Sequence, residues 1–218
     1  MHRTLLRTSL TGATVTLVAC AALGVLMALA APMVHAQPAV GVLDAPPVNT
    51  YDSQGLLREQ VEQTRSRRVE RVFFGTGVMQ RETVYAMNGE QAVREREVVF
   101  APTGVMLREQ RWVGGELSLD NEFLASGVMR SKREYTGLGP TRELRVQTFY
   151  SSGVLATEER YAAPSGSSQL TPIGVQRTHD SSGRLLQEST HDLQGRLVSQ
   201  RQRSTQGDGL LPVTPNPR

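Results

Sequence analysis

The sequence predicts an all-β protein, in which a repeat array of antiparallel β-hairpins forms an extended meander sheet after an N-terminal signal peptide. Three observations lead to this fold class. A short motif around a glycine recurs along the chain, and the residues after each copy alternate with a period of two. Hydrophobic residues make up only 39% of the chain and aromatic residues 5%. This composition is thin for one large core and suits units that each cover their neighbour.

Residues 1–36 have the pattern of a secretory signal peptide. Arg3 and Arg7 give a positive start, and the run from Leu17 to Ala31 is apolar and without charge. Val34-His35-Ala36 then offers small residues where a signal peptidase cleaves. We therefore expect a periplasmic or secreted protein.

Two alternatives attach the protein to a membrane. The stretch from Ala13 to Ala31 approaches the length of a membrane-spanning helix, so an uncleaved leader would act as an anchor. Leu17-Val18-Ala19-Cys20 reads like a lipobox, which would make Cys20 the lipid-carrying residue of a lipoprotein. Cys20 is also the only cysteine, so a chain cleaved after Ala36 contains no disulfide.

The rest of the chain divides into three segments. Residues 37–50 are rich in Pro, Ala and Val and are predicted to be a linker. Residues 51–203 form the β-hairpin repeat domain, interrupted by a surface loop from Ala162 to Ile173. Residues 204–218 contain three prolines and are predicted to be a disordered tail.

Seven copies of the motif define the repeat. Each has an aromatic residue or His four positions before a glycine, and Leu or Met two positions after it. The glycines are Gly55, Gly77, Gly104, Gly127, Gly153, Gly183 and Gly195, at spacings of 22, 27, 23, 26, 30 and 12 residues. A second ring stands eight positions after the glycine in the middle copies, as Tyr85, Trp112, Tyr135, Tyr161 and His191. A fixed element at this period is typical of a repeat array.

Each motif is predicted to be a hairpin turn. A three-residue loop that ends in a glycine with positive φ is a common hairpin connection. Counting outward from it places the ring opposite the Leu or Met, which predicts the cross-strand pairs Phe73–Met79, Phe100–Met106, Phe123–Met129 and Phe149–Leu155.

The strand after Gly77 is predicted to alternate without interruption. Met79, Arg81, Thr83 and Tyr85 would then share one face of the sheet. The Arg and Glu residues in the middle of each strand are expected to pair across strands.

The pattern of a ring, three residues, Gly, any residue, Leu, a polar strand and a second ring resembles the variant MORN repeat of the YwqK-like antitoxin family. The resemblance covers Tyr51 to Arg203, and the second glycine of that repeat is present as Gly89 and Gly115. It implies an array of antiparallel hairpins and a binding role. A local resemblance to the YD repeats of large secreted proteins, at His179 to Leu185 and His191 to Leu197, implies hairpins too.

No catalytic residue, cofactor or metal is expected. The chain has no Gly-x-Ser-x-Gly nucleophile motif and, once cleaved, no cysteine. His179-Asp180 and His191-Asp192 are a duplicated pair of potential metal ligands. Both histidines, however, occupy the ring position of the repeat, and both aspartates occupy a turn position, so a structural role explains them better.

The remaining hypotheses concern binding. Two of the 24 basic residues, Arg3 and Arg7, lie in the leader, which leaves 22 basic against 21 acidic residues and argues against nucleic acid as a partner. The first hypothesis is a non-catalytic exported protein whose sheet binds a macromolecule, either a protein or another envelope component. Trp112, with Arg111 and Arg133 as neighbours, is the candidate anchor.

The second hypothesis is a structural or carbohydrate-contacting envelope protein. It would use Tyr85, Trp112, Tyr135 and Tyr161 as a stacking stripe. Buried rings favour the first hypothesis, and an exposed stripe favours the second.

Overall fold

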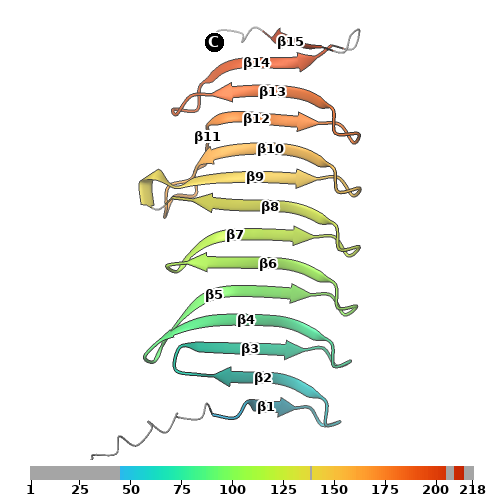
Figure 1. The fold of residues 1–218 in the computed structure, drawn as a ribbon, viewed down its shortest axis with the longest axis vertical. Helices are drawn as coiled ribbons and strands as arrows, with labels where there is room; N and C mark the ends of the chain where they lie inside the picture. The colour runs from blue at the N-terminus through green and yellow to red at the C-terminus, as the bar shows by residue number, and fades with distance from the viewer. Residues whose placement is uncertain (1–44, 138, 205–208, 214–218) are drawn as a thin grey trace, which may run out of the picture. The chain divides into compact units, whose positions relative to one another are not determined.

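The protein folds into a single antiparallel sheet (Figure 1). The computed structural model describes residues 45–137, 139–204 and 209–213, so the predicted signal peptide lies outside the described residues. Within these residues the sheet has 15 strands that follow one another in chain order, and only β11 lies off this path, beside β10. In the described part of the chain no α-helix covers either face, and no helix is long and apolar enough to cross a membrane. The predicted all-β meander of hairpins is confirmed.

The strand bounds are β1 Val48–Tyr51, β2 Leu57–Gln63, β3 Arg67–Phe73, β4 Met79–Asn88, β5 Gln91–Phe100, β6 Met106–Val113, β7 Glu116–Phe123, β8 Met129–Thr136, β9 Glu143–Phe149, β10 Leu155–Ala162, β11 Thr171–Pro172, β12 Gly174–His179, β13 Leu185–His191, β14 Leu197–Arg203 and β15 Leu210–Val213. One 3-10 turn, η1, spans Gly139–Thr141.

The glycine turns all have the same geometry. At the second copy the Phe74 N–H donates to the Val78 carbonyl over 2.8 Å, and the Gly77 N–H donates to the Phe74 carbonyl over 2.9 Å. The equivalent two bonds close all seven turns, and the seven glycines have φ between +80° and +85°. Just outside these turns the four predicted ring–aliphatic pairs are confirmed, because Phe73, Phe100, Phe123 and Phe149 lie opposite their Met or Leu partners.

A β-bulge follows every glycine turn, and it separates side chains that simple alternation places together. Phe73 pairs with Met79, but Val72 pairs with Arg81, so Gln80 has no partner residue. The same one-residue skip follows the other six glycines. Neighbouring residues of a strand point to opposite faces and paired residues share a face. Met79 and Arg81 therefore lie on opposite faces, and the prediction that they share one is wrong.

The two rows of rings consequently lie on opposite sides of the sheet. We define face A as the side that carries Phe73 and Met79, and face B as the side that carries Arg81 and Tyr85. The register from strand to strand puts the whole Phe row and its Met and Leu partners on face A. The same register puts Trp112, Tyr135 and Tyr161 on face B with Tyr85.

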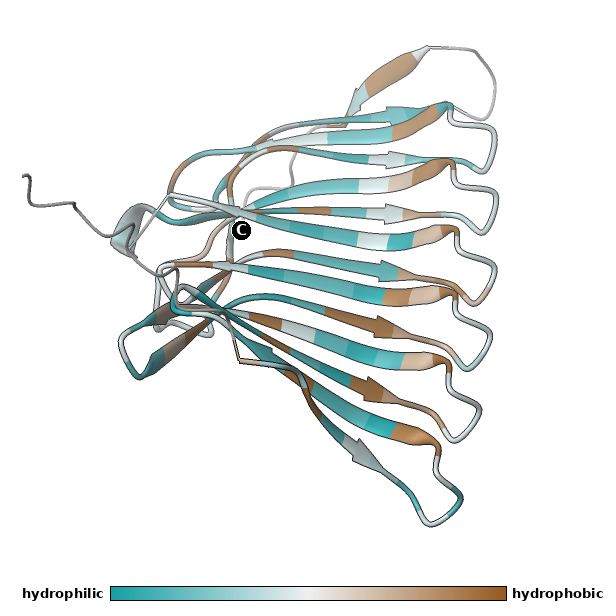
Figure 2. Cartoon of the chain, turned by 60° about the horizontal axis from the view of Figure 1, so that its bottom comes forward, coloured by the Kyte–Doolittle hydropathy of each residue, from teal (hydrophilic) through white to brown (hydrophobic). Residues whose placement is uncertain are grey.

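Six of the seven glycine turns stack along one edge of the sheet (Figure 2). A Cβ at Gly127 would lie 3.9 Å from Val105 Cγ1, and one at Gly153 would lie 3.8 Å from Val128 Cγ1, so each of these turns rests on the valine of the previous one. Gly195 is the exception. Gly195 follows Gly183 by 12 residues, so only one strand lies between these two glycines, whereas two strands lie between the others. Gly195 therefore lies at the opposite edge of the sheet, beside Thr171.

The apolar core is small because the sheet has a single layer. Val69, Val84 and Val98 are buried on face A, and Leu144 is buried on face B. Arg96 is a cross-strand partner of Val84, and an arginine stem in such a position can cover an apolar side chain while its charged end stays in water.

The strand array is longer at both ends than the sequence predicted. β1 begins at Val48, inside the predicted linker 37–50, and pairs with β2. β15 lies inside the predicted disordered tail 204–218 and pairs with β14, so that prediction is wrong for residues 210–213. β15 pairs with the open edge of β14, and Pro212 is tolerated there because an edge strand needs fewer N–H donors.

Replacing Gly127 by Val is expected to destabilise the protein by about 1–2 kcal/mol, because a β-branched residue is strained at positive φ. The position has room for the side chain, so the cost comes from the backbone. Urea unfolding followed by circular dichroism measures the change. Ser126→Val, at the exposed preceding position, is the control and should be nearly neutral. Equal costs for the two variants would contradict the turn geometry.

Candidate functional site

Face A carries two runs of alternating arginine and glutamate side chains along the middle of the sheet. Consecutive partners in the first run are Glu62, Arg71, Glu82, Arg96, Glu109 and Arg111, with N–O distances of 2.8, 3.0, 3.6, 3.0 and 2.9 Å. The second run joins Arg145, Glu158, Arg177 and Glu188. The predicted cross-strand pairing of Arg and Glu is therefore present, and on face A it is organised into continuous rows.

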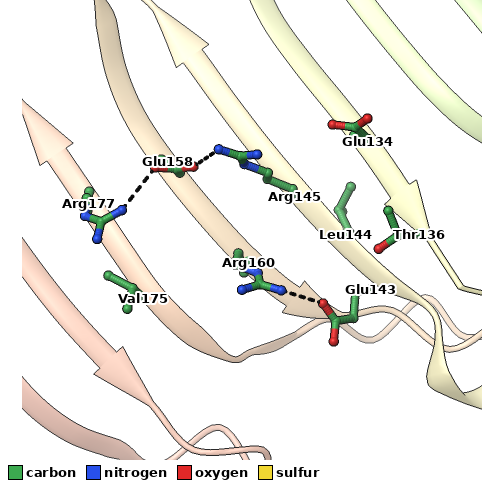
Figure 3. A pocket seen from close by; sticks show the side chains of 9 residues that line it. All are labelled: Glu134, Thr136, Glu143, Leu144, Arg145, Glu158, Arg160, Val175 and Arg177. Atoms are coloured by element: carbon green, nitrogen blue, oxygen red, sulfur yellow. Dashed lines mark hydrogen bonds and ion pairs between the residues drawn. The ribbon is translucent and has the colours of Figure 1, made fainter.

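A hollow of about 570 Å³ opens on face A beside the second run (Figure 3). Its lining residues on face A are Glu134, Thr136, Glu143, Arg145, Glu158, Arg160, Val175 and Arg177, and Leu144, whose side chain belongs to face B, also borders it. It lies where the regular ladder is interrupted. β10 pairs with β12 only through Thr157–Thr178 and Glu158–Arg177, and the end of β10 pairs with β11 instead. The hollow thus lies beside the end of β10, where this strand leaves β12.

Glu158 is the most enclosed charged group of the hollow, with 14% of its side chain exposed. Arg145 Nη2 donates to one of its carboxylate oxygens and Arg177 Nη1 to the other. Burial alone would raise the pKa of the Glu158 carboxyl. The hydrogen bonds and positive charges of Arg145 and Arg177 outweigh burial and hold this pKa below its ordinary value.

Lowering the pH is expected to destabilise the protein once Glu158 and Glu109 begin to take up protons. Burial would raise the pKa of Glu109 too, but bonds from Arg111 and Arg96 lower it below the ordinary 4.5. A carboxyl group whose pKa is lower in the folded state than in the unfolded state stabilises the fold at a pH above its unfolded-state pKa. This contribution is lost as the pH falls through the folded-state pKa.

Urea unfolding from about pH 7 to about pH 3 measures this loss. Glu158→Gln should show a shallower decrease than the wild type below the ordinary carboxyl pKa of 4.5. A wild-type stability that stays constant down to about pH 3 would contradict the assignment.

On face B the ring row is packed against neighbouring side chains. Trp112 is half-buried opposite Leu117, and the Arg94 guanidinium lies 5.1 Å from its ring centroid. The Arg142 guanidinium lies 4.1 Å from the centre of the Tyr135 ring. These cation–π contacts cover ring faces that a stacking ligand would need.

The hydroxyl groups of the outer rings are engaged with carboxylates. The Tyr85 hydroxyl donates to Glu70 over 3.2 Å, and the Tyr161 hydroxyl donates to Glu159 over 2.8 Å. Burial, together with the hydrogen bond and charge of Glu159, raises the pKa of Tyr161 to about 12. The contact of Tyr85 thus joins β4 to β3 and that of Trp112 joins β6 to β5, whereas the bond of Tyr161 stays within β10.

The three residues predicted as a partner-binding cluster do not share one face of the sheet. Trp112 lies on face B, whereas Arg111 lies on face A beside Glu109. Arg133 is on face B, 3.6 Å from Glu122 and 3.8 Å from Asp120. The guanidinium that lies over the Trp112 ring belongs instead to Arg94, on the neighbouring strand β5. The sequence does not show this contact, because the two residues are far apart in the chain.

The duplicated His-Asp pairs have structural positions. The Asp180 carboxylate accepts hydrogen bonds from the Ser182 hydroxyl and from the Ser182 and Arg184 N–H groups, which lower its pKa to about 2. Asp192 accepts the equivalent backbone bonds from Gln194 and Arg196. Within residues 45–137, 139–204 and 209–213, no three His, Cys, Asp or Glu side chains are grouped so as to hold a metal ion.

Comparison with protein-family models gives no match for this sequence, and no curated protein matches it. The resemblance to the variant MORN repeat therefore stays a prediction.

Proposed function

We propose that this is a non-catalytic exported repeat protein that binds a macromolecular partner, a protein or another envelope component, across face A. The observation that carries the proposal is the combination on one face of the hollow, the charged runs and the half-buried Phe–Met row. Repeat arrays commonly present such extended faces to their partners. The resemblance to antitoxin repeats supports a protein as the partner.

Face B is the weaker candidate. Arginine side chains lie over Trp112 and Tyr135, and carboxylates engage the hydroxyls of Tyr85 and Tyr161. A carbohydrate-contacting stripe needs free ring faces, so this arrangement gives the second hypothesis less support. The side chains of Arg145 and Arg160 at the hollow on face A are about half exposed and are accessible to a partner.

Photo-cross-linking in cells that produce the protein tests the proposal. Gln147 lies on face A and Val146 on face B of the same strand, and both are half-buried. A photo-reactive amino acid at Gln147 is expected to give a discrete adduct, and the same group at Val146 is expected to give none. Adducts from Val146 alone, or none from Gln147, would contradict binding across face A.

Export is tested separately by mass spectrometry of the protein from a cell-envelope fraction. A chain that begins at Gln37 is the expected product of the signal peptide. A lipid-carrying N-terminus at Cys20 would make the protein a lipoprotein instead.

A further inference from the structure

We infer that the hollow on face A binds a carboxylate group of an acidic ligand through Arg145 and Arg160. This inference rests on the proposed function, since it names the chemistry that a partner presents at this face. The hollow falls within the ~300–1,000 Å³ range of small-ligand sites, which is large enough for an acidic side chain or a short acidic peptide.

The first argument is the placement of two like charges. Arg145 on β9 and Arg160 on β10 are direct cross-strand partners, so their side chains leave the same face side by side. Like charges in this position destabilise a sheet. An anion between the two guanidinium groups would remove that repulsion.

The second argument is that the protein already holds its own carboxylates there. Glu158 lies between Arg145 and Arg177, and Glu143 accepts a bond from Arg160 Nη2 over 2.8 Å (Figure 3). A guanidinium has five N–H donors, and the bonds described for Arg145 and Arg160 use one nitrogen of each. Donors therefore remain for a further carboxylate.

The third argument is the difference between the two internal ion pairs. Glu158 is largely enclosed, so it holds Arg145 in place. The side chains of Arg160 and Glu143 are 51% and 39% exposed, and an exposed ion pair of this kind contributes little stability. A ligand carboxylate can displace Glu143 from Arg160 at small cost.

The charge of the hollow favours a carboxylate over a phosphate group. Three arginines and three glutamates line it, so it is formally neutral. A singly charged planar carboxylate matches the fork of a guanidinium. A phosphate dianion concentrates two charges on one group, so this group would meet more repulsion from the three glutamates than a single carboxylate does.

Isothermal titration of the full chain tests the inference with tetraglutamate, tetraglutamine and inorganic phosphate as probes. Tetraglutamate is expected to bind, and the other two are expected to bind much more weakly. Arg160→Gln should weaken tetraglutamate binding by about tenfold or more, because it removes a charged hydrogen-bond donor. Arg81→Gln, an exposed arginine on face B, is the matched control and should leave binding unchanged.

The inference is overturned if tetraglutamate does not bind, or if phosphate or tetraglutamine binds as tightly as tetraglutamate. It is also overturned if Arg160→Gln and Arg81→Gln weaken tetraglutamate binding equally. Circular dichroism of both variants shows whether they remain folded. A cross-link at Gln147 without tetraglutamate binding would reject this inference and leave the proposed function standing. Tetraglutamate binding without the cross-link would reject the proposed function alone.

Discussion

Replacing Val98 by Asp is expected to cost about 4 kcal/mol of unfolding free energy or to prevent folding. Val98 is 1% exposed and is the most completely buried side chain of the described residues. Its cross-strand partners on face A are Glu82 and Glu109. The new carboxylate would be buried between two others, and the Arg96 guanidinium that lies between these glutamates is already paired with both of them.

Val99→Asp is the matched control for this prediction. The neighbouring residue lies on face B, where its cross-strand partners are Arg81 and Arg108. An Asp at this half-buried position gains two positive neighbours, so a cost of about 1 kcal/mol or less is expected. Urea unfolding of both variants measures the difference. Similar costs for the two would mean that the assignment of faces, and with it the bulge after each turn, is wrong.

Replacing Arg142 by Ala is expected to cost about 2–3 kcal/mol, because several contacts of one enclosed guanidinium are lost together. Only 14% of the Arg142 side chain is exposed. Its Nη2 donates to the Leu117 carbonyl, its Nε lies 3.7 Å from a Glu116 oxygen, and its plane covers the Tyr135 ring. The substitution leaves the Leu117 carbonyl and Glu116 without this partner.

Arg142→Lys separates charge from shape. Lysine keeps the positive charge but has no planar fork, so we expect it to recover less than half of the loss. Arg130→Ala, at an exposed position of the same sheet, should change the stability by less than about 0.5 kcal/mol. Thermal and urea unfolding give the order of the three variants. A neutral Arg142→Ala variant would show that the contacts around Tyr135 add nothing to stability.

The hairpins could be predicted because their determinants are local. A glycine with positive φ, a ring four positions before it and an aliphatic residue two positions after it lie within seven residues of one another. The pairing of Phe123 with Met129 therefore follows from counting outward from Gly127. The chain order of the strands follows from the short connections in the same way.

The faces and the candidate site could not be predicted in this way. The bulge at Gln80 is a feature of two strands together, and nothing in the local alternation marks it. Every residue beyond it changes face, which is why Met79 and Tyr85 lie on opposite faces although simple alternation places them on one. The hollow depends on where β10 leaves β12 for β11, and the sequence shows this only as an interruption of the repeat.

The order of the strands also determines how the protein responds to mechanical tension. The described chain begins at one outer strand of the sheet and ends at the other, and each strand pairs with its neighbour in the sequence. A pulling force applied to β1 and β15 is transmitted from strand to strand across the inter-strand hydrogen bonds. The outermost strands then peel away one after another, each at low force, instead of shearing together. Stretched between two anchored structures, the sheet would lengthen in steps and shorten again by re-pairing adjacent strands.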